Sequence, residues 1–374
     1  MKLFAPRYYQ QFSCIADRCQ HTCCAGWEID IDEKTAKKYA TIQHPYGAVI
    51  RDSIEVSDGV PHFCLKDGER CPHLDDTGLC RIIREMGEDA LCEICREHPR
   101  FYHITPDGME VGLGMACEEA CRLILFNGDA REMVQIGQVT QRRPRHLFDT
   151  RADRQVLDAI LADSSLPYPQ RLCRIYTHFG IAPTAHPDEA WHALLNELEY
   201  MDDAHRTLFC CYSSDLKCAE EHASILSRAL AYFVFRHCSQ TCDTEDFLAS
   251  LGFCLFCERL LASLLAEHPT DRIDALIDAA RILSVPRLLF LRGAEELPDG
   301  EHGCYPCTRA SRICRHGFRP YGRLCAHRGF RLCGHLCARR GFRLYGRLCA
   351  HRGCHGHPAV CLLRSEPHPC RSKP

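Results

Sequence analysis

The sequence predicts a mainly α-helical protein with a cysteine-rich N-terminal region and one small β-hairpin. Three observations predict this class: helical spacing of apolar residues recurs along the middle of the chain, strand signals are confined to one pair of segments, and 29 of the 374 residues are cysteines. The chain is 46% hydrophobic and 25% charged, with a formal net charge of −3. Such a composition can bury a core, and it excludes a wholly disordered or collagen-like protein.

The predicted helices begin shortly after the first cysteines. Asp32 is a suitable N-cap for a helix through residues 35–39, because its carboxylate can accept the free N–H groups of a first turn. Seven further segments carry apolar residues at intervals of three and four positions, which indicates helices with one buried face. These segments are residues 81–91, 118–126, 154–161, 189–200, 219–237, 244–266 and 272–283.

The predicted hairpin joins residues 101–104 to residues 109–111. The intervening sequence Thr105-Pro106-Asp107-Gly108 is typical of a tight turn. Gly112 and Gly114 follow directly, and we interpret them as the exit from the hairpin rather than as a nucleotide-binding loop.

The N-terminus and the apolar segments indicate where in the cell the protein is located. The first ten residues contain no uninterrupted apolar run, so we expect no signal peptide. No apolar, charge-free segment approaches 18 residues, so we expect no membrane partner and a cytoplasmic location. In a reducing compartment, clustered thiols favour metal ligation over disulfides.

The cysteines form three populations. Eleven lie in residues 1–121, eight in residues 173–257 and ten in residues 304–370. Cys254 and Cys257 of the second population lie in Leu- and Phe-rich helical sequence, which favours packing in a core over ligation.

The C-terminal region is an internal repeat with a different charge. A 12-residue unit begins at Gly317, Gly329 and Gly341, and residues 301–374 contain 15 Lys and Arg residues but two acidic ones. We therefore divide the chain into a metal- or cluster-binding domain (1–130), a helical domain (131–300) and a basic tail (301–374) that is not part of the fold. The tail could bind nucleic acid or metal, but a low-complexity extension without a core is favoured over both.

The N-terminal cysteines predict a metal centre. C-x4-C-x3-C-C at residues 14–24 is followed by cysteines in four more short motifs, and soft thiolates from several segments suit zinc or an iron–sulfur cluster. Vicinal cysteines cannot readily bind one centre together, so one of Cys23 and Cys24 packs or serves a second ion. A structural and a catalytic role for the metal both stay open. The candidate ligands are Cys19, Cys23, Cys71, Cys80, Cys95 and Cys117, with Cys14, Cys24 and Cys92 in second rank.

The same motifs carry a resemblance to a known family. The quoted elements are residues 12–27 (FSCIADRCQHTCCAGW), Cys71-Pro72-x-Leu74, Leu79-Cys80-x-Ile82, Gly87, Leu91, Cys95, Pro99-Arg100 and Cys117-Glu118. In this order they resemble the flagellin lysine-N-methylase family, and more broadly the cysteine-cluster proteins described as zinc- or iron-chelating. The resemblance is specific over residues 8–126. After residue 270, the acidic helical segment expected of the family gives way to the repeats.

The resemblance implies methyl transfer from S-adenosylmethionine to lysine ε-amino groups of flagellin. A lysine amine with its usual pKa of about 10.4 is protonated, so a displacement needs a base or a desolvating channel. Aromatic residues could line such a channel, with Trp27, Tyr232, Phe233 and Phe235 as candidates, although core packing is favoured. The sequence assigns no catalytic or cofactor-binding residue, and it lacks the C-x3-C-x2-C triplet of radical S-adenosylmethionine enzymes. A non-enzymatic zinc- or iron-chelating protein is the alternative.

Overall fold

The structure is a computed structural model that describes residues 1–127, 130–140, 147–181, 188–197, 203–215, 220–267 and 273–283. By its internal contacts the chain divides into residues 1–330 and residues 331–374, and only the first unit contains described residues. The repeat tail, with its alternative roles in nucleic-acid or metal binding, lies outside the described residues. The domain division at residues 130 and 300 stays a prediction.

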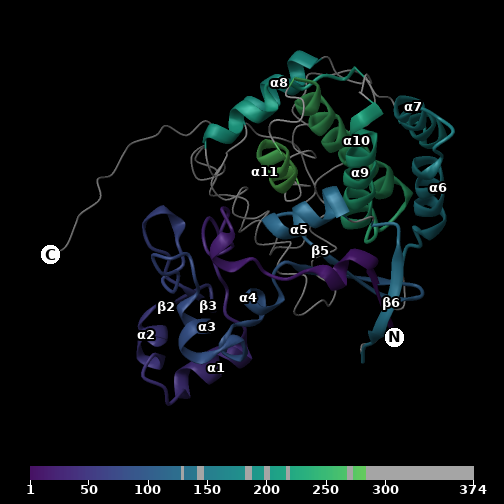
Figure 1. The fold of residues 1–374 in the computed structure, drawn as a ribbon. Helices are drawn as coiled ribbons and strands as arrows, with labels where there is room; N and C mark the ends of the chain where they lie inside the picture. The colour runs from purple at the N-terminus through teal and green to yellow at the C-terminus, as the bar shows by residue number, and fades with distance from the viewer. Residues whose placement is uncertain are drawn as a thin grey trace, which may run out of the picture. The chain divides into compact units, whose positions relative to one another are not determined.

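The mainly helical class is confirmed, because each of the predicted helical segments contains a helix (Figure 1). Helices over residues 47–52, 93–97 and 168–179 were not predicted; the first two span only six and five residues, too few to show a helical period. The helices are α1 (Glu33–Thr41), α2 (Gly47–Asp52), α3 (Arg81–Met86), α4 (Glu93–Glu97), α5 (Glu118–Arg122), α6 (Arg151–Ala162), α7 (Tyr168–Phe179), α8 (Asp188–Glu197), α9 (Ala223–Cys238), α10 (Thr244–Glu267) and α11 (Ile273–Leu283).

Local sequence explains where several of these helices begin and end. Asp32 caps α1 as predicted, because its side chain accepts the Thr35 N–H at 2.9 Å. The predicted helix at 81–91 ends early at Gly87, whose φ of +83° is open to glycine but unfavourable for other residues. The helix predicted at 118–126 continues beyond α5 as a π-helical turn, Leu123–Asn127.

The structure contains more strands than the single hairpin that was predicted. The prediction of the fold class was incomplete in this respect. The hairpin β4 (Arg100–Thr105) and β5 (Gly108–Leu113) is confirmed, but it belongs to a four-stranded sheet of order β4-β5-β1-β6. β1 (Lys2–Pro6) runs parallel to β5, and β6 (Met133–Gln138) pairs antiparallel to β1. A second hairpin joins β2 (Ile54–Ser57) and β3 (Val60–Phe63).

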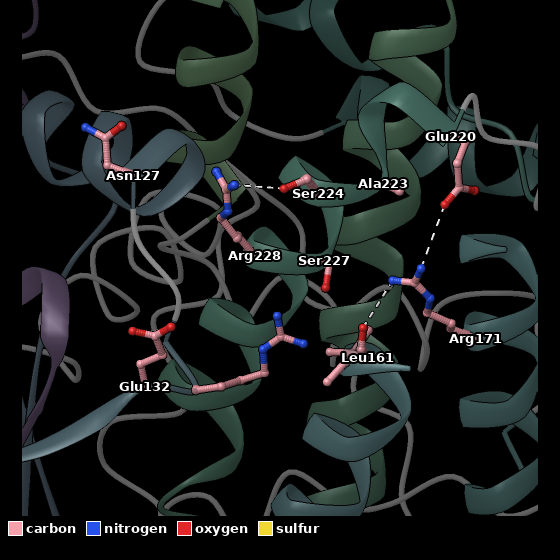
Figure 2. Close-up of a pocket in the computed structure, with 11 residues that line it drawn as sticks. Asn127, Glu132, Leu161, Arg171, Glu220, Ala223, Ser224, Ser227 and Arg228 are labelled. Atoms are coloured by element: carbon pink, nitrogen blue, oxygen red, sulfur yellow. Dashed lines mark hydrogen bonds and ion pairs between the residues drawn. The ribbon is translucent and has the colours of Figure 1, made fainter. Parts of the chain in front are cut away.

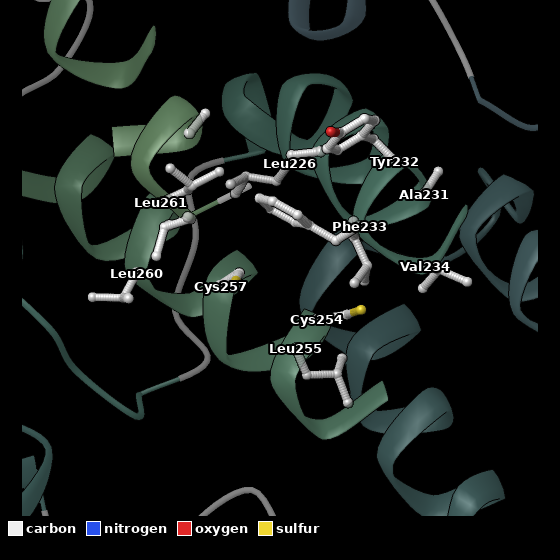
Figure 3. Close-up of a cluster of buried hydrophobic side chains, with 14 of the residues drawn as sticks. Leu226, Ala231, Tyr232, Phe233, Val234, Cys254, Leu255, Cys257, Leu260 and Leu261 are labelled. Carbon is white, nitrogen blue, oxygen red and sulfur yellow. The ribbon is translucent and has the colours of Figure 1, made fainter. Parts of the chain in front are cut away.

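Two clusters of buried hydrophobic residues hold the described residues together. The smaller lies within the cysteine-rich region and includes Ile29, Tyr39 and Phe63. The larger is centred on α9 and α10 (Figure 3) and also takes in Tyr8 and Leu113 of the N-terminal third. Packing of these distant segments in one core positions the cysteine-rich region against the helices.

The interior of α9 and α10 confirms the expectation that the cysteines there fill a core. Cys254 and Cys257 are both fully buried in the larger cluster, which also includes Leu226 and Leu260 (Figure 3). Tyr232 and Phe233 are fully buried as well, and the Tyr232 hydroxyl accepts the N–H of Met115 at 2.9 Å. These aromatic side chains therefore pack in the core, as favoured above, and do not line a channel.

Helix α10 is the one described helix that is long and apolar enough to cross a membrane. Of its most apolar 18-residue stretch, 72% is buried inside the protein. The helix packs against α9 and α11. This burial is typical of the central helix of a folded domain.

Gly112 lies in strand β5 and Gly114 just after it, so the strand continues two residues beyond its predicted end at residue 111. A Cβ atom added at Gly112 would lie 2.6 Å from Phe235 Cε1 and 2.7 Å from Phe101 Cε1. Gly112 is therefore needed for close packing of the strand against buried aromatic rings.

Gly112→Ala is expected to lower the free energy of unfolding by about 1–3 kcal/mol, because overpacking displaces buried rings. Urea unfolding monitored by circular dichroism measures the change. Gly137→Ala in β6 is the matched control, since nothing lies within 4 Å of the added Cβ there. Equal stabilities of the two variants would contradict the packing argument.

Candidate functional site

Several of the candidate ligands lie at the starts of short helices. Cys80 immediately precedes α3, Cys92 precedes α4 and Cys117 precedes α5. Each thiol is thus next to the unpaired N–H groups of a first helical turn, which favour the negatively charged thiolate. Cys95 lies one turn further along, within α4.

The thiols of Cys71, Cys80, Cys92 and Cys95, together with those of Cys23 and Cys24, form the first thiol group. Burial is the main cause that raises the pKa of Cys71 to about 11, with smaller contributions from Cys80 and Cys92. Burial likewise raises the pKa of Cys80, with contributions from Cys23 and Cys92. A hydrogen bond of 2.7 Å from the Cys71 N–H to the Cys24 carbonyl joins two of these segments.

Cys92 and Cys95 interact directly within this group. A hydrogen bond from Cys95 lowers the pKa of Cys92, and the same bond, together with burial, raises the pKa of Cys95. The charge of Cys24 also raises the pKa of Cys95. Of this pair, Cys92 is therefore the more easily ionised thiol.

Cys14, Cys19 and Cys117 form the second thiol group, around Glu118. The Cys19 thiol donates to Glu118 Oε2 at 3.5 Å, and burial is the main cause that raises the pKa of Cys19 to about 12. Burial raises the pKa of Cys117 to about 11, and the charges of Cys23 and Cys14 add to this effect. Cys23 thus acts electrostatically on both groups, while its neighbour Cys24 acts on Cys95.

The two groups supply the kind of donor that zinc or an iron–sulfur cluster requires. All the candidate ligands fall in one or other group, and their soft sulfur atoms suit both metals. Among the described residues, however, no three Cys, His, Asp or Glu side chains are arranged so that they could hold a metal ion. The ligand assignments therefore stay predictions.

A polar contact beside the second thiol group was not predicted from the sequence. His21 Nδ1 lies 2.9 Å from Glu118 Oε2, and His21 Nε2 lies 2.8 Å from Asp278 Oδ1 of α11. Glu118 Oε2 also accepts the N–H groups of Gln20 at 2.8 Å and His21 at 3.1 Å. No periodic pattern or sequence motif connects residues so far apart in the chain. The only indication in the sequence was that His21 lies between Cys19 and Cys23.

Trp27, the remaining aromatic candidate, packs within the cysteine-rich region. Its Nε1–H donates to the Cys23 carbonyl at 2.7 Å, and its ring stacks on His98 with centroids 6.4 Å apart. These contacts hold the backbone that carries the vicinal cysteines.

A separate polar cavity of about 570 Å³ lies between α6, α7 and α9 (Figure 2). Two of its arginines are bound to neighbouring protein groups: Arg228 donates to the Leu125 carbonyl at 2.8 Å and Arg171 to the Leu161 carbonyl at 3.2 Å. Arg171 also lies 3.8 Å from Glu220. These contacts indicate a structural role for Arg171 and Arg228, and the cysteine-rich region is the candidate functional site.

Three known proteins match part of the chain. The flagellar biosynthetic protein FliU of Salmonella muenchen is 32% identical over 135 residues, which cover 33% of this chain and 78% of that protein. The lysine-N-methylases of Salmonella typhimurium strain LT2 and Salmonella choleraesuis strain SC-B67 are also 32% identical over 135 residues. The match covers 33% of each of these two proteins, so the chain spans about a third of their length.

Two other comparisons gave no match: no protein-family model and no solved structure matches the chain. The assignment therefore depends on the curated relatives and on the cysteine motifs described above. Since the chain covers more than two thirds of FliU at 32% identity, the two proteins share a family origin. The chain belongs to the lysine-N-methylase family that includes FliU.

Proposed function

We propose that the protein is an S-adenosylmethionine-dependent lysine N-methyltransferase that acts on flagellin. The observation that carries this proposal is the match to lysine-N-methylases and to a flagellar biosynthetic protein. The match covers about a third of the methylases, so the activity, the methyl donor and the substrate are all part of the proposal.

In the proposed reaction, the lysine nitrogen attacks the methyl carbon of S-adenosylmethionine as the carbon–sulfur bond breaks. S-adenosylhomocysteine leaves with the bonding electron pair, and the amine proton passes to a base. A lysine amine must lose its proton before it can attack, because its usual pKa is about 10.4. The site therefore needs a carboxylate or a desolvated channel next to the bound lysine.

The proposal includes a thiolate-bound zinc ion or iron–sulfur cluster in the cysteine-rich region. Cys19, Cys23, Cys71, Cys80, Cys95 and Cys117 are the proposed ligands, drawn from the two thiol groups described above. Binding a soft cation would ionise these thiols and release protons, since the burial of Cys71 and Cys117 holds their pKa at about 11. Such a centre would also tie together loops that contain little regular structure.

A non-enzymatic zinc- or iron-chelating protein is the second candidate function. The same gathered thiols favour it, because they suit a metal whether or not a methyl group is transferred. The two candidates differ in one respect, namely whether flagellin is modified.

Cys95→Ala is expected to abolish flagellin methylation. We would delete the gene in a flagellated host, complement it with wild type or variant, and measure the intact mass of purified flagellin. Wild type should add mass in steps of one methylene unit per methylation, and Cys95→Ala should add none, because Cys95 interacts with Cys92, Cys24 and Cys71 of the first thiol group. Cys173→Ala is the matched control, since Cys173 is an exposed thiol in α7.

Unmodified flagellin in every strain would contradict the methyltransferase proposal. Zinc or iron retained by the purified wild-type protein would then favour the chelating alternative. Loss of the methyl groups in both cysteine variants would show that the effect is not specific to the thiol group.

A further inference from the structure

His21, Glu118 and Asp278 form a contact that we call the His21 clasp. Its members come from the N-terminal cysteine segment, the start of α5 and the middle of α11, respectively. The three side chains are between 16% and 23% exposed. Arg281 is a further charged group next to the clasp, 3.6 Å from Asp278.

Glu118 is the centre of the clasp on the side of the cysteines. One oxygen, Oε2, faces the imidazole of His21, the N–H groups of Gln20 and His21, and the thiol of Cys19. Bonds to two consecutive backbone N–H groups fix the position of the chain and not only of a side chain. The residues around Cys19 are therefore held directly over the start of α5.

Helix α11 contributes the third member because it is docked on α5 by independent contacts. Cys121 Sγ donates to the Ile277 carbonyl at 3.7 Å, and Arg281 Nε donates to the Ala116 carbonyl at 3.0 Å. Asp278 lies between these two contacts along α11 and points to His21. Loss of the Asp278 carboxylate would thus remove one of the two ring contacts of His21 without undocking the helix.

We propose that His21 is a positioning residue, which through Glu118 and Asp278 fixes the segment that carries Cys19 and Cys23, so that α11 forms part of the thiol site. Both ring nitrogens of His21 are used, one toward each carboxylate. This inference rests on the proposed role of the cysteine-rich region, but it does not depend on methyl transfer.

The test measures how fast the Cys19 thiol reacts with iodoacetamide in the full-length protein. Samples are quenched at intervals, digested and analysed by mass spectrometry, with zinc and iron contents determined in parallel. Asp278→Ala and His21→Ala should each alkylate Cys19 several-fold faster than wild type. Asp278→Glu should stay closer to wild type, because it keeps a carboxylate facing His21.

His62→Ala is the matched control, because His62 Nε2 also lies 3.4 Å from a carboxylate, that of Glu28, but outside the clasp. Its Cys19 should react at the wild-type rate. Urea midpoints of all variants should agree closely, which would exclude general unfolding as the cause of faster alkylation. Wild-type alkylation rates in both Asp278→Ala and His21→Ala would overturn the proposal.

The same variants separate this inference from the methyltransferase proposal. Faster alkylation without any flagellin methylation by wild type would support the clasp and contradict the proposed activity. Methylation of flagellin by wild type, with unchanged alkylation of Cys19 in the variants, would support the proposed activity and contradict the clasp.

Discussion

Glu258→Ala is expected to lower the free energy of unfolding by about 3–5 kcal/mol, because it leaves a buried charge without its partner. Glu258 is fully buried and Arg259 is 2% exposed. Arg259 Nε and Nη2 each donate to a different Glu258 oxygen at 2.6 Å, and the Tyr168 hydroxyl donates to Glu258 Oε1 at 3.1 Å. Removal of the carboxylate leaves the guanidinium in an apolar helix with neutral acceptors such as the Asp215 carbonyl.

Urea unfolding at pH 7 measures this effect, and two further variants define its origin. Replacing Glu258 with Gln and Arg259 with Met together should restore much of the loss, since neither residue then carries a charge. Lys37→Ala should cost less than about 1 kcal/mol, because its pair with Glu33 is exposed. A loss below about 1 kcal/mol for Glu258→Ala would show that water reaches the pair.

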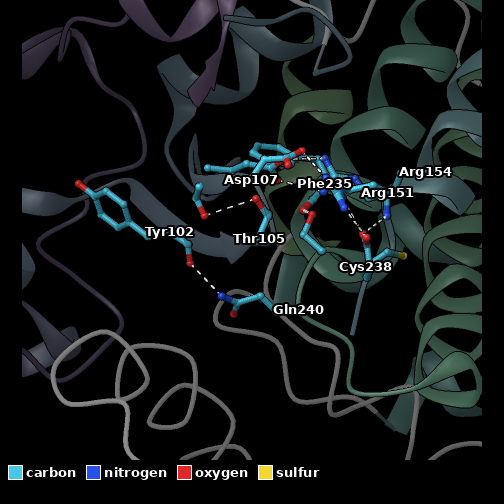
Figure 4. A network of polar contacts seen from close by, with 12 residues as sticks. Tyr102, Thr105, Asp107, Arg151, Arg154, Phe235, Cys238 and Gln240 are labelled. Atoms are coloured by element: carbon cyan, nitrogen blue, oxygen red, sulfur yellow. Dashed lines mark hydrogen bonds and ion pairs between the residues drawn. The ribbon is translucent and has the colours of Figure 1, made fainter. Parts of the chain in front are cut away.

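His103 is expected to make the protein less stable as the pH falls below 6.5. Its side chain is 4% exposed, on β4, next to the rings of Phe101 and Phe235. Burial, followed by the charges of Arg236 and Arg154, lowers the pKa of His103 to about 3. Figure 4 shows Arg154 in the polar network at this hairpin, where it also pairs with Glu110 at 3.0 Å.

Stability falls as the pH falls because the unfolded state binds the proton more readily than the folded state. Between pH 6.5 and about 3, the unfolded chain protonates this histidine and the folded chain does not, so each proton taken up favours unfolding. The contribution of neutral His103 to the free energy of unfolding is fully present above pH 6.5, and about 2 kcal/mol of it is lost by pH 5. His103→Phe keeps an aromatic ring in place and should lose this part of the pH dependence.

Urea unfolding of wild type and His103→Phe at pH 7 and pH 5 checks the prediction. The stability difference between the two proteins should change by about 2 kcal/mol between these pH values. Parallel behaviour of the two proteins would indicate that another group causes the acid sensitivity.

Several features were predicted correctly because their causes are local in sequence. The N-cap at Asp32, the hairpin turn after Thr105 and the apolar spacing of α9 and α10 each depend on residues within a few positions of one another. The core position of Cys254 and Cys257 followed from their Leu- and Phe-rich surroundings in the same way. The cysteine motifs likewise indicated the family to which the chain belongs.

Other features could not be predicted because they depend on partners far away in the chain. β1 and β6 lack a strong strand pattern, and each becomes a strand by pairing in one sheet. The buried pair of Glu258 and Arg259 also receives hydrogen bonds from distant segments, because the Tyr168 hydroxyl donates to Glu258 and the Asp215 carbonyl accepts from Arg259.

The sequence by itself thus determined the helical class, the local caps and turns, and the thiol chemistry of the N-terminal region. Only the tertiary structure decided how the cysteines divide between two groups and that Asp278 reaches His21. The physical reason is that periodicity and motif spacing report short-range forces. The charges, burial and hydrogen bonds at a site depend instead on which distant segments pack together.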